Sequence, residues 1–373
     1  MNRREALLLA AGSSLFVHRT LPGAPHPQDS NSELGLVIYT LALRRKAGLS
    51  GEPKEDLFEP FAFLDYCRSL GAMGAQLPLG IREADFCRQL RDRAGQYGMF
   101  IEGIVQVPKA DEDLARFEAE VRTAAQAGAL VLRTAIFSGR RYEQFDTLAE
   151  YRSAAEQARR AVFRAVPVLR RHRVRLAIEN HKDQRVEEHV ALLRAAGSEY
   201  VGACVDLGNN FALLEDPITV VEALAPWAFS VHIKDQAVQE YQDGFLFADV
   251  PLGEGFLDLK QMVDILRRAR PKVRFNLETL TRDPLKVPVL TEKYWATFPE
   301  VAGRDLARTL RIVRARQAPR LPQVSHLPLA EQVAAEAAGI ARSLQYARRT
   351  LAPNASRGLR VGFEFDPQPG RSL

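Results

Sequence analysis

The sequence has few cysteines and histidines, no block of basic residues and no long apolar run, and each of these absences argues against a class of protein. Its 373 residues include only three cysteines, which are too few and too scattered for a disulfide framework or a thiolate zinc site. The seven histidines are also few, so any metal site must be built mainly from carboxylates. No block of lysines and arginines accompanies the net charge of +5, and we expect no nucleic-acid partner. No apolar run approaches the roughly 20 residues that span a bilayer, so we expect a mature protein without a membrane span.

Residues 1–33 have the pattern of an export signal followed by a linker. Arg3 and Arg4 precede an apolar run over residues 6–17, and adjacent arginines are typical of a twin-arginine signal. Residues 21–33 are polar and rich in proline, as expected where a signal is removed. We therefore predict a protein exported to the periplasm. If the segment is instead an ordinary amphipathic N-terminal helix, the protein is cytoplasmic.

From residue 34 onward, short apolar segments alternate with longer stretches of helical period. Eight segments are predicted as strands: 36–41, 75–79, 100–107, 130–136, 175–179, 201–206, 229–233 and 274–278. The intervening helices imply parallel pairing, and eight such units over about 250 residues match a (β/α)8 TIM barrel. An open doubly wound sheet is the alternative, but the Gly-rich phosphate turn of that fold does not follow the first strand.

We place the barrel at residues 34–316, with residues 301–316 as its eighth outer helix. The longer connection between the seventh and eighth strands is expected to hold an inserted loop. Residues 317–373 are predicted to form a C-terminal helical extension and tail, with a helix over 330–351. This extension has no chemical signature, so we expect it to pack on the barrel or on a second subunit of a homo-oligomer.

A polar residue ends each of the last four predicted strands. These residues are Glu179, Asp206, His232 and Glu278. Active sites of TIM barrels form at the carboxyl ends of the strands, so four consecutive strands would direct these side chains to one point. Three carboxylates held close together resist ionising together unless a cation lies between them. We therefore predict one divalent metal ion bound by all four residues, with Mn²⁺ favoured and Mg²⁺ or Co²⁺ as alternatives.

With these motifs, residues 34–316 resemble the xylose isomerase-like TIM barrels of the sugar phosphate isomerase/epimerase superfamily. The segments that carry the resemblance are 177–181 (AIENH), 205–209 (VDLGN), 231–235 (VHIKD), 251–255 (PLGEG) and 276–278 (NLE). The resemblance implies the same four metal ligands and makes Glu179 and Glu278 the catalytic acid/base pair. In the ketose epimerases of this superfamily, a histidine that touches substrate stands where this chain has Asn209.

Such a site suits removal of a proton from the carbon beside a carbonyl of a carbohydrate substrate. A divalent ion that binds the carbonyl and the neighbouring hydroxyl stabilises the resulting enediolate electrostatically. Two carboxylates on opposite faces then remove and return the proton, which makes isomerase or epimerase the predicted activity. The same intermediate can expel a group from the β carbon. A lyase or dehydratase acting on a keto sugar or 3-keto-glycoside is therefore the main alternative.

Five more polar residues near the strand ends are candidate substrate ligands: His181, Lys182, Asn209, Lys234 and Arg282. Lys234 lies two residues after His232, on the same side of the strand, where an ion pair with a ligand carboxylate is an equally good interpretation. Arg282 could hold an anionic substrate group, and a surface role is the alternative. Two other classes stay open: a zinc phosphodiesterase of the DNA repair type, which the few histidines disfavour, and a non-catalytic sugar-binding protein.

Overall fold

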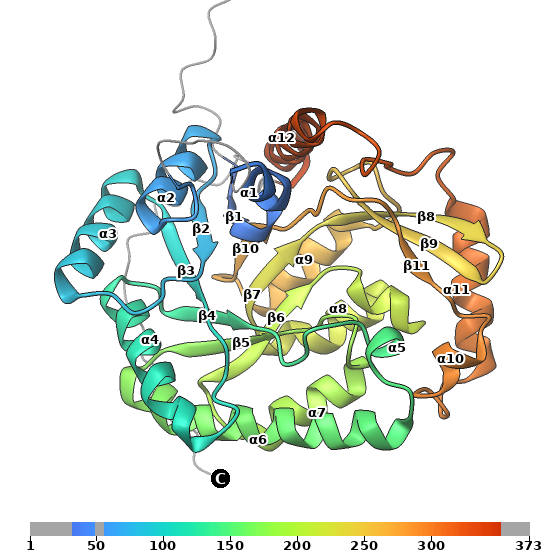
Figure 1. The fold of residues 1–373 in the computed structure, drawn as a ribbon, viewed down its shortest axis with the longest axis horizontal. Helices are drawn as coiled ribbons and strands as arrows, with labels where there is room; N and C mark the ends of the chain where they lie inside the picture. The colour runs from blue at the N-terminus through green and yellow to red at the C-terminus, as the bar shows by residue number, and fades with distance from the viewer. Residues whose placement is uncertain (1–31, 49–55, 352–373) are drawn as a thin grey trace, which may run out of the picture.

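The computed structural model describes residues 32–48 and 56–351, and the predicted export signal lies outside these residues. Eight parallel strands close into a barrel surrounded by helices (Figure 1), which confirms the predicted TIM barrel. The strands are β1 (Leu34–Val37), β2 (Gly74–Leu77), β3 (Phe100–Ile104), β4 (Val131–Thr134), β5 (Arg175–Glu179), β6 (Val201–Asp206), β7 (Ala228–Ile233) and β10 (Arg274–Leu277). Around the barrel, β5, β6, β7 and β10 are consecutive neighbours.

Helices cover the outside of the barrel and begin at signals that the sequence carries. The Asp216 and Asp258 side chains each accept a hydrogen bond from the backbone N–H three residues ahead, and Pro217 occupies a first turn. These helices are α1 (Ala42–Gly48), α2 (Pro60–Ser69), α3 (Ala84–Tyr97), α4 (Leu114–Gln126), α6 (Leu148–His172), α7 (Val186–Ala196), α8 (Pro217–Leu224) and α9 (Leu259–Ala269). Within the described residues, no helix combines the length and apolarity needed to cross a bilayer.

Side-chain alternation along the strands separates the apolar core from the polar interior of the barrel. In β5, Leu176 and Ile178 are fully buried in the main apolar cluster, which fills the layer between strands and helices. Because successive side chains of a strand point to opposite faces, Ala177 and Glu179 project to the inside. The strand therefore delivers Glu179 to the carboxyl end of the barrel with its side chain directed inward.

A second, three-stranded sheet replaces the loop that the sequence predicted after the seventh strand. It contains β8 (Asp235–Tyr241), β9 (Gly244–Val250) and β11 (Leu285–Val287), paired antiparallel in the order β11-β9-β8. Phe245 and Phe247 of β9 pack on Phe211, with ring centroids 5.4 and 5.8 Å apart. The sheet leaves the barrel after β7 and β10, and it therefore stands beside the carboxyl ends of the strands.

The prediction of residues 301–316 as the eighth outer helix is wrong. Helix α11 (Gly303–Arg316) packs on the second sheet, and its Val313 belongs to the same apolar cluster as Phe245. The position of an eighth outer helix is taken by α12 (Leu329–Tyr346), which lies against α1 (Figure 1). Its Ile340 and Leu344 belong to the main barrel core. The chain after β10 first completes the second sheet and forms the short α10 (Glu292–Trp295), which carries α11 away from the barrel. The predicted extension thus supplies the missing outer helix.

Candidate metal centre and active-site pocket

The four predicted ligand residues converge at the carboxyl end of the barrel. Glu179 and Asp206 are the last residues of β5 and β6, His232 lies in β7, and Glu278 directly follows β10. One ligand atom from each lies within 4.8 Å of the others, and all four residues are buried. Convergence follows from the strand order, because neighbouring parallel strands end at the same edge of the barrel.

The imidazole of His232 is oriented by an amide inside the barrel. His232 Nε2 lies 2.7 Å from Oε1 of Gln76, a residue of β2, and donates its proton there. His232 Nδ1 faces the carboxylates, 3.3 Å from Glu278 Oε2 and 3.6 Å from Glu179 Oε2. A partner on one ring nitrogen selects the tautomer that leaves the other nitrogen free to bind a metal.

Gln76 is itself held by a buried polar network around Glu102. Glu102 Oε2 accepts hydrogen bonds from Gln76 Nε2 at 2.9 Å, Ser230 Oγ at 2.6 Å and Asn276 Nδ2 at 2.9 Å. The first of these bonds also identifies which end of the Gln76 amide is the oxygen that faces His232. Burial raises the pKa of Glu102, while the hydrogen bonds from Ser230 and Gln76 oppose that rise. The network lies behind His232 and fixes its ring.

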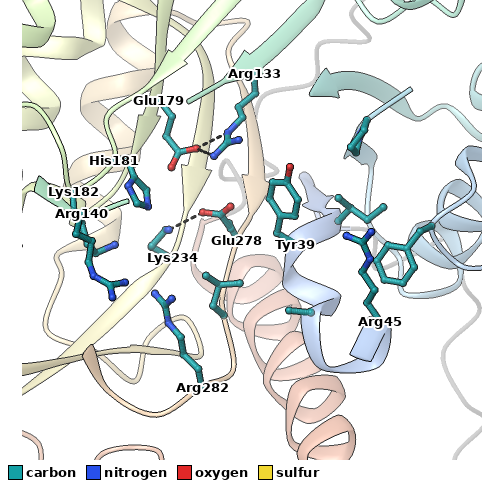
Figure 2. A pocket seen from close by; sticks show the side chains of 15 residues that line it. Tyr39, Arg45, Arg133, Arg140, Glu179, His181, Lys182, Lys234, Glu278 and Arg282 are labelled. Atoms are coloured by element: carbon teal, nitrogen blue, oxygen red, sulfur yellow. Dashed lines mark hydrogen bonds and ion pairs between the residues drawn. The ribbon is translucent and has the colours of Figure 1, made fainter. Parts of the chain in front are cut away.

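Two cations pair with the three carboxylates, and Figure 2 shows Arg133 beside Glu179 and Lys234 beside Glu278. Arg133 Nε lies 2.5 Å from Glu179 Oε2, and Lys234 Nζ lies 2.8 Å from Asp206 Oδ2 and 2.7 Å from Glu278 Oε2. Burial raises the pKa of Asp206 to about 6, although Lys234 opposes the rise. Burial would also raise the pKa of Glu278, but Lys234 and then His232 hold it well below its usual range. Lys234 therefore forms the ion pair that its position in the strand allowed.

The donor atoms at this site fit a divalent metal ion. Asp206 Oδ1 and His232 Nδ1 are buried and form no hydrogen bond within the described residues. Buried polar atoms without partners are costly, and an ion bound between them would satisfy both. Carboxylate oxygens with one imidazole suit Mn²⁺, Mg²⁺ or Co²⁺. Glu179 and Glu278 could complete the ligand set, sharing their charge between the ion and Arg133 or Lys234.

A cavity of about 560 Å³ opens directly above this cluster. Its described lining residues are Ile38, Tyr39, Ala42, Arg45, Phe58, Pro78, Arg133, Arg140, Glu179, His181, Lys182, Lys234, Glu278, Leu280 and Arg282. Of the predicted substrate ligands, Asn209 is the one not on this wall. It is fully buried, donating to Asp206 Oδ2 at 2.6 Å and accepting from Lys182 Nζ at 2.5 Å. Asn209 thus connects Lys182 to Asp206 of the four-residue donor cluster.

The cavity wall offers both neutral and charged groups to a substrate. Burial and the neighbouring Lys182 lower the pKa of His181 to about 3, so its imidazole is neutral at pH 7. Burial and the charge of Lys234 lower the pKa of Lys182 to about 8. Arg282, for which a surface role was the alternative, lines the cavity and lies 3.7 Å from Asp249 Oδ2.

Sequence inspection missed several lining residues, among them Tyr39, Arg133 and Arg140. Arg133 carried a usable signal, because a charged residue inside the apolar segment 130–136 needs an explanation. Tyr39 was hidden because the predicted first strand extended to residue 41, whereas β1 ends at Val37 and Tyr39 lies in a 3-10 turn. Arg140 lies in the connection after β4, where nothing local distinguishes it from a surface arginine.

Comparison with known proteins finds a relative that matches part of the chain. A 3-oxo-isoapionate decarboxylase from Pectobacterium atrosepticum is 33% identical over 110 residues, which are 29% of this chain and 40% of that enzyme. The match therefore spans well under two thirds of the relative's length.

Solved structures share the fold at low sequence identity. A xylose isomerase-like TIM barrel protein from Mycobacterium smegmatis, solved in complex with magnesium, is 18% identical, with a TM-score of 0.50 over 75% of this chain and 98% of that one. An L-ribulose 3-epimerase is 14% identical, with a TM-score of 0.50 over 87% of this chain and 99% of that one. The family model described as xylose isomerase-like TIM barrel matches residues 64–311, more than half of the sequence. The chain belongs to the xylose isomerase-like TIM barrel family.

Proposed function

We propose that the protein is a metal-dependent sugar isomerase or epimerase that removes a proton from the carbon beside a carbonyl. The observation that carries the proposal is that two carboxylates of the four-residue donor cluster, Glu179 and Glu278, also line the cavity. A group bound by the cluster and a substrate in the cavity would therefore meet at these two side chains. We propose Mn²⁺ as the ion, with Mg²⁺ or Co²⁺ as alternatives, and a carbohydrate as the substrate.

The chain's own residues would position and move the proton. When bound, a divalent ion would polarise the substrate carbonyl and so acidify the adjacent C–H bond. Burial would raise the pKa of Glu179, but Arg133 holds it below its usual value, so the carboxylate is ionised and able to accept a proton. Glu278, kept ionised by Lys234, is the second such group. A positioned general acid or base contributes about 10²–10⁴-fold to a rate.

A lyase is the second candidate, because the curated relative with 33% identity over 110 residues is named a decarboxylase. In such a reaction, the bond between the α carbon and a carboxyl group breaks and carbon dioxide leaves. The electron pair stays on the carbon beside the carbonyl, and that carbon then takes a proton from water, relayed through Glu179 or Glu278. The early requirement, a stabilised negative charge beside a carbonyl, is the same as for an isomerase.

Incubation of the Mn²⁺-loaded protein with a panel of keto sugars in D₂O tests the proposal. We expect deuterium to enter an unfragmented sugar, measured by NMR and mass spectrometry. Glu179→Gln and Glu278→Gln should each lower the rate by about 10²-fold or more. Glu254→Gln, which changes an exposed carboxylate paired with Arg342, is the control and should keep the rate.

Two outcomes would decide against an isomerase. Release of carbon dioxide or water from the substrate would instead support the lyase. If the wild-type protein binds sugars but exchanges no deuterium and releases nothing, the site is a non-catalytic sugar-binding site.

Export to the periplasm is a separate proposal that rests on Arg3, Arg4 and the apolar run that follows them. Expression of the full chain in a host with a twin-arginine export system tests it. We expect a shortened protein in the periplasmic fraction, and Arg3→Lys together with Arg4→Lys should retain the protein in the cytoplasm. Equal export of this double variant would contradict the proposal.

A further inference from the structure

Cationic side chains outnumber carboxylates on the cavity wall. The cations are Arg45, Arg133, Arg140, Lys182, Lys234 and Arg282, and the carboxylates are Glu179 and Glu278. Arg133 and Lys234 are paired with these two glutamates. The remaining four cations have no carboxylate partner among the described residues that line the cavity. The wall is therefore positively charged before any metal ion adds to it.

Lys182 is the most unusual of these cations. Its side chain is buried, with 3% of the residue exposed, and Nζ donates to a neutral group, Asn209 Oδ1. In the part of the chain that the structure describes, Lys182 takes part in no ion pair with a carboxylate. A buried ammonium that makes no ion pair is costly. Burial and the charge of Lys234 lower the pKa of Lys182 to about 8, although the more distant Asp249 and Asp206 oppose this shift. A bound anion would reduce the cost of burying this ammonium group.

Arg140 and Arg282 lie on the same side of the cavity as Lys182, whereas Arg45 lies across from them (Figure 2). Arg282 is close enough for its charge to lower the pKa of Lys182. Arg140 Nε lies 2.7 Å from Glu143 Oε1, and Arg282 Nη2 lies 3.7 Å from Asp249 Oδ2. A guanidinium has five N–H donors, so each of these contacts leaves donors for a ligand.

We propose that the substrate is an anionic carbohydrate whose negatively charged group is bound by Lys182, Arg140 and Arg282. These residues follow β5, β4 and β10, so three separate connections converge on one anion. The carbonyl end of the substrate would then lie at Glu179 and Glu278, and this part rests on the proposed function. A carboxylate and a phosphate share the required chemistry, and both are included in the test.

The test compares matched probes that differ in charge. D-gluconate, D-sorbitol and D-sorbitol 6-phosphate share a six-carbon chain, and their affinities are measured by calorimetry on protein freed of metal by chelation and dialysis. We expect at least one anionic probe to bind about ten-fold or more tightly than sorbitol. Raising NaCl from about 50 to about 500 mM should shrink this advantage, because salt screens charge. Preference for gluconate assigns a carboxylate, and preference for the phosphate assigns a phosphate.

Lys182→Met and Arg282→Gln should each remove most of the affinity advantage of the anionic probe over sorbitol. Two variants are used so that Arg282→Gln carries the test if Lys182→Met does not fold. Arg88→Gln removes the same charge from an exposed site on α3 and should keep the preference.

The proposal is overturned if sorbitol binds as tightly as both anions, or if the advantage survives in both pocket variants. Because this measurement needs neither metal nor turnover, its result is independent of the deuterium experiment. Anion preference without deuterium exchange contradicts only the proposed function. Exchange of a neutral keto sugar with no anion preference contradicts only the present inference.

Discussion

The orientation of His232 depends on Gln76, an amide far away in the sequence. Gln76→Leu keeps the approximate volume of the side chain but removes the acceptor for Nε2–H. The ring can then turn or change tautomer, and we expect affinity for Mn²⁺ to fall by about 10–100-fold, the usual effect of losing such a partner. Isothermal titration with Mn²⁺ measures the change.

Gln89→Leu provides the matched control for this variant. Gln89 lies on the exposed face of α3, where it donates to Asp85. The same chemical change at this position should leave Mn²⁺ affinity unaltered. Equal affinities of the Gln76 variant and the wild type would show that the histidine needs no help from the network around Glu102.

The buried carboxyl group of Glu215 makes the stability of the folded protein depend on pH. It is buried, accepting from Asn210 Nδ2 at 2.6 Å and from the backbone N–H of Val186, and burial raises its pKa from 4.5 to about 7. Between these values the folded protein keeps a proton that the unfolded chain releases. Stability from this group is therefore complete below about pH 4.5 and is lost as pH rises through about 7.

The variant Glu215→Gln cannot titrate and should lack this loss. The free energy of unfolding of the wild type, relative to the variant, should fall by about 1–3 kcal/mol between about pH 5 and about pH 8. Urea unfolding at several pH values measures it. A difference that is flat with pH would refute the prediction.

Among single residues, the sequence predicted the candidate metal ligands better than the residues that surround them. Glu179, Asp206 and Glu278 stand out because each ends an apolar run, where an ionisable group is unexpected. Gln76 lies in a short, weakly patterned strand, and an uncharged amide there has no distinctive signal. Arg140 lines the cavity because of how the connection after β4 is placed in three dimensions, and the sequence of that connection alone does not reveal this.

At the scale of elements, α12 stabilises the start of α1 through one side chain. Glu336 Oε2 accepts from the backbone N–H of Leu43 at 2.7 Å, and Oε1 accepts from that of Arg44 at 3.2 Å. These N–H groups belong to the first turn of α1, which otherwise leaves them without helical partners. Glu336→Ala should therefore lower the free energy of unfolding by about 1–3 kcal/mol, as measured in urea.

Glu331→Ala is the control on the same helix, because Glu331 is exposed in the first turn of α12. It should change stability by no more than about 0.5 kcal/mol. If Glu336→Ala is equally mild, then α12 is joined to α1 by apolar packing alone.

Element boundaries were predicted well where local chemistry decides them and poorly where packing does. Asp258 begins α9 as its capping role predicts. Helix α11 has a good amphipathic pattern, but that pattern does not state which apolar surface it will cover. The hairpin of β8 and β9 was overlooked because β8 is mostly polar, although Asp243 and Gly244 offer a turn signal just before the aromatic residues of β9.

For the whole molecule, a metal ion bound only by the folded state should raise resistance to unfolding. Free Mn²⁺ at about 100 times its dissociation constant should add about 2.7 kcal/mol, with the midpoint of thermal unfolding rising accordingly. Chelation should reverse the rise. Asp206→Asn should abolish it, because that residue supplies an otherwise unpartnered oxygen.

Asp264→Asn, at an exposed position paired with Lys260, is the control and should preserve the Mn²⁺ response. A midpoint of thermal unfolding that stays constant with Mn²⁺, Mg²⁺ and Co²⁺ would mean that Arg133 and Lys234 already meet the charge requirement of the cluster.

The closed barrel was predictable because eight repeated units leave few alternatives. The charge balance was predictable only for Lys234, whose ion pair with a ligand carboxylate the strand position suggested, and not for Arg133, which approaches Glu179 from a different strand.

The connections that lead into the second sheet form part of the cavity wall, but the sheet contributes none of the four donor residues. It departs from the barrel just beyond His232 and just beyond Glu278, and it brings Arg282 to the cavity through the connection into β11. Lengthening, shortening or exchanging the second sheet would change the shape of the cavity, while the four donor residues would keep their places in the barrel. Proteins with the same barrel strands could thus change their substrate by altering the second sheet, while the donor residues and their chemistry stay the same.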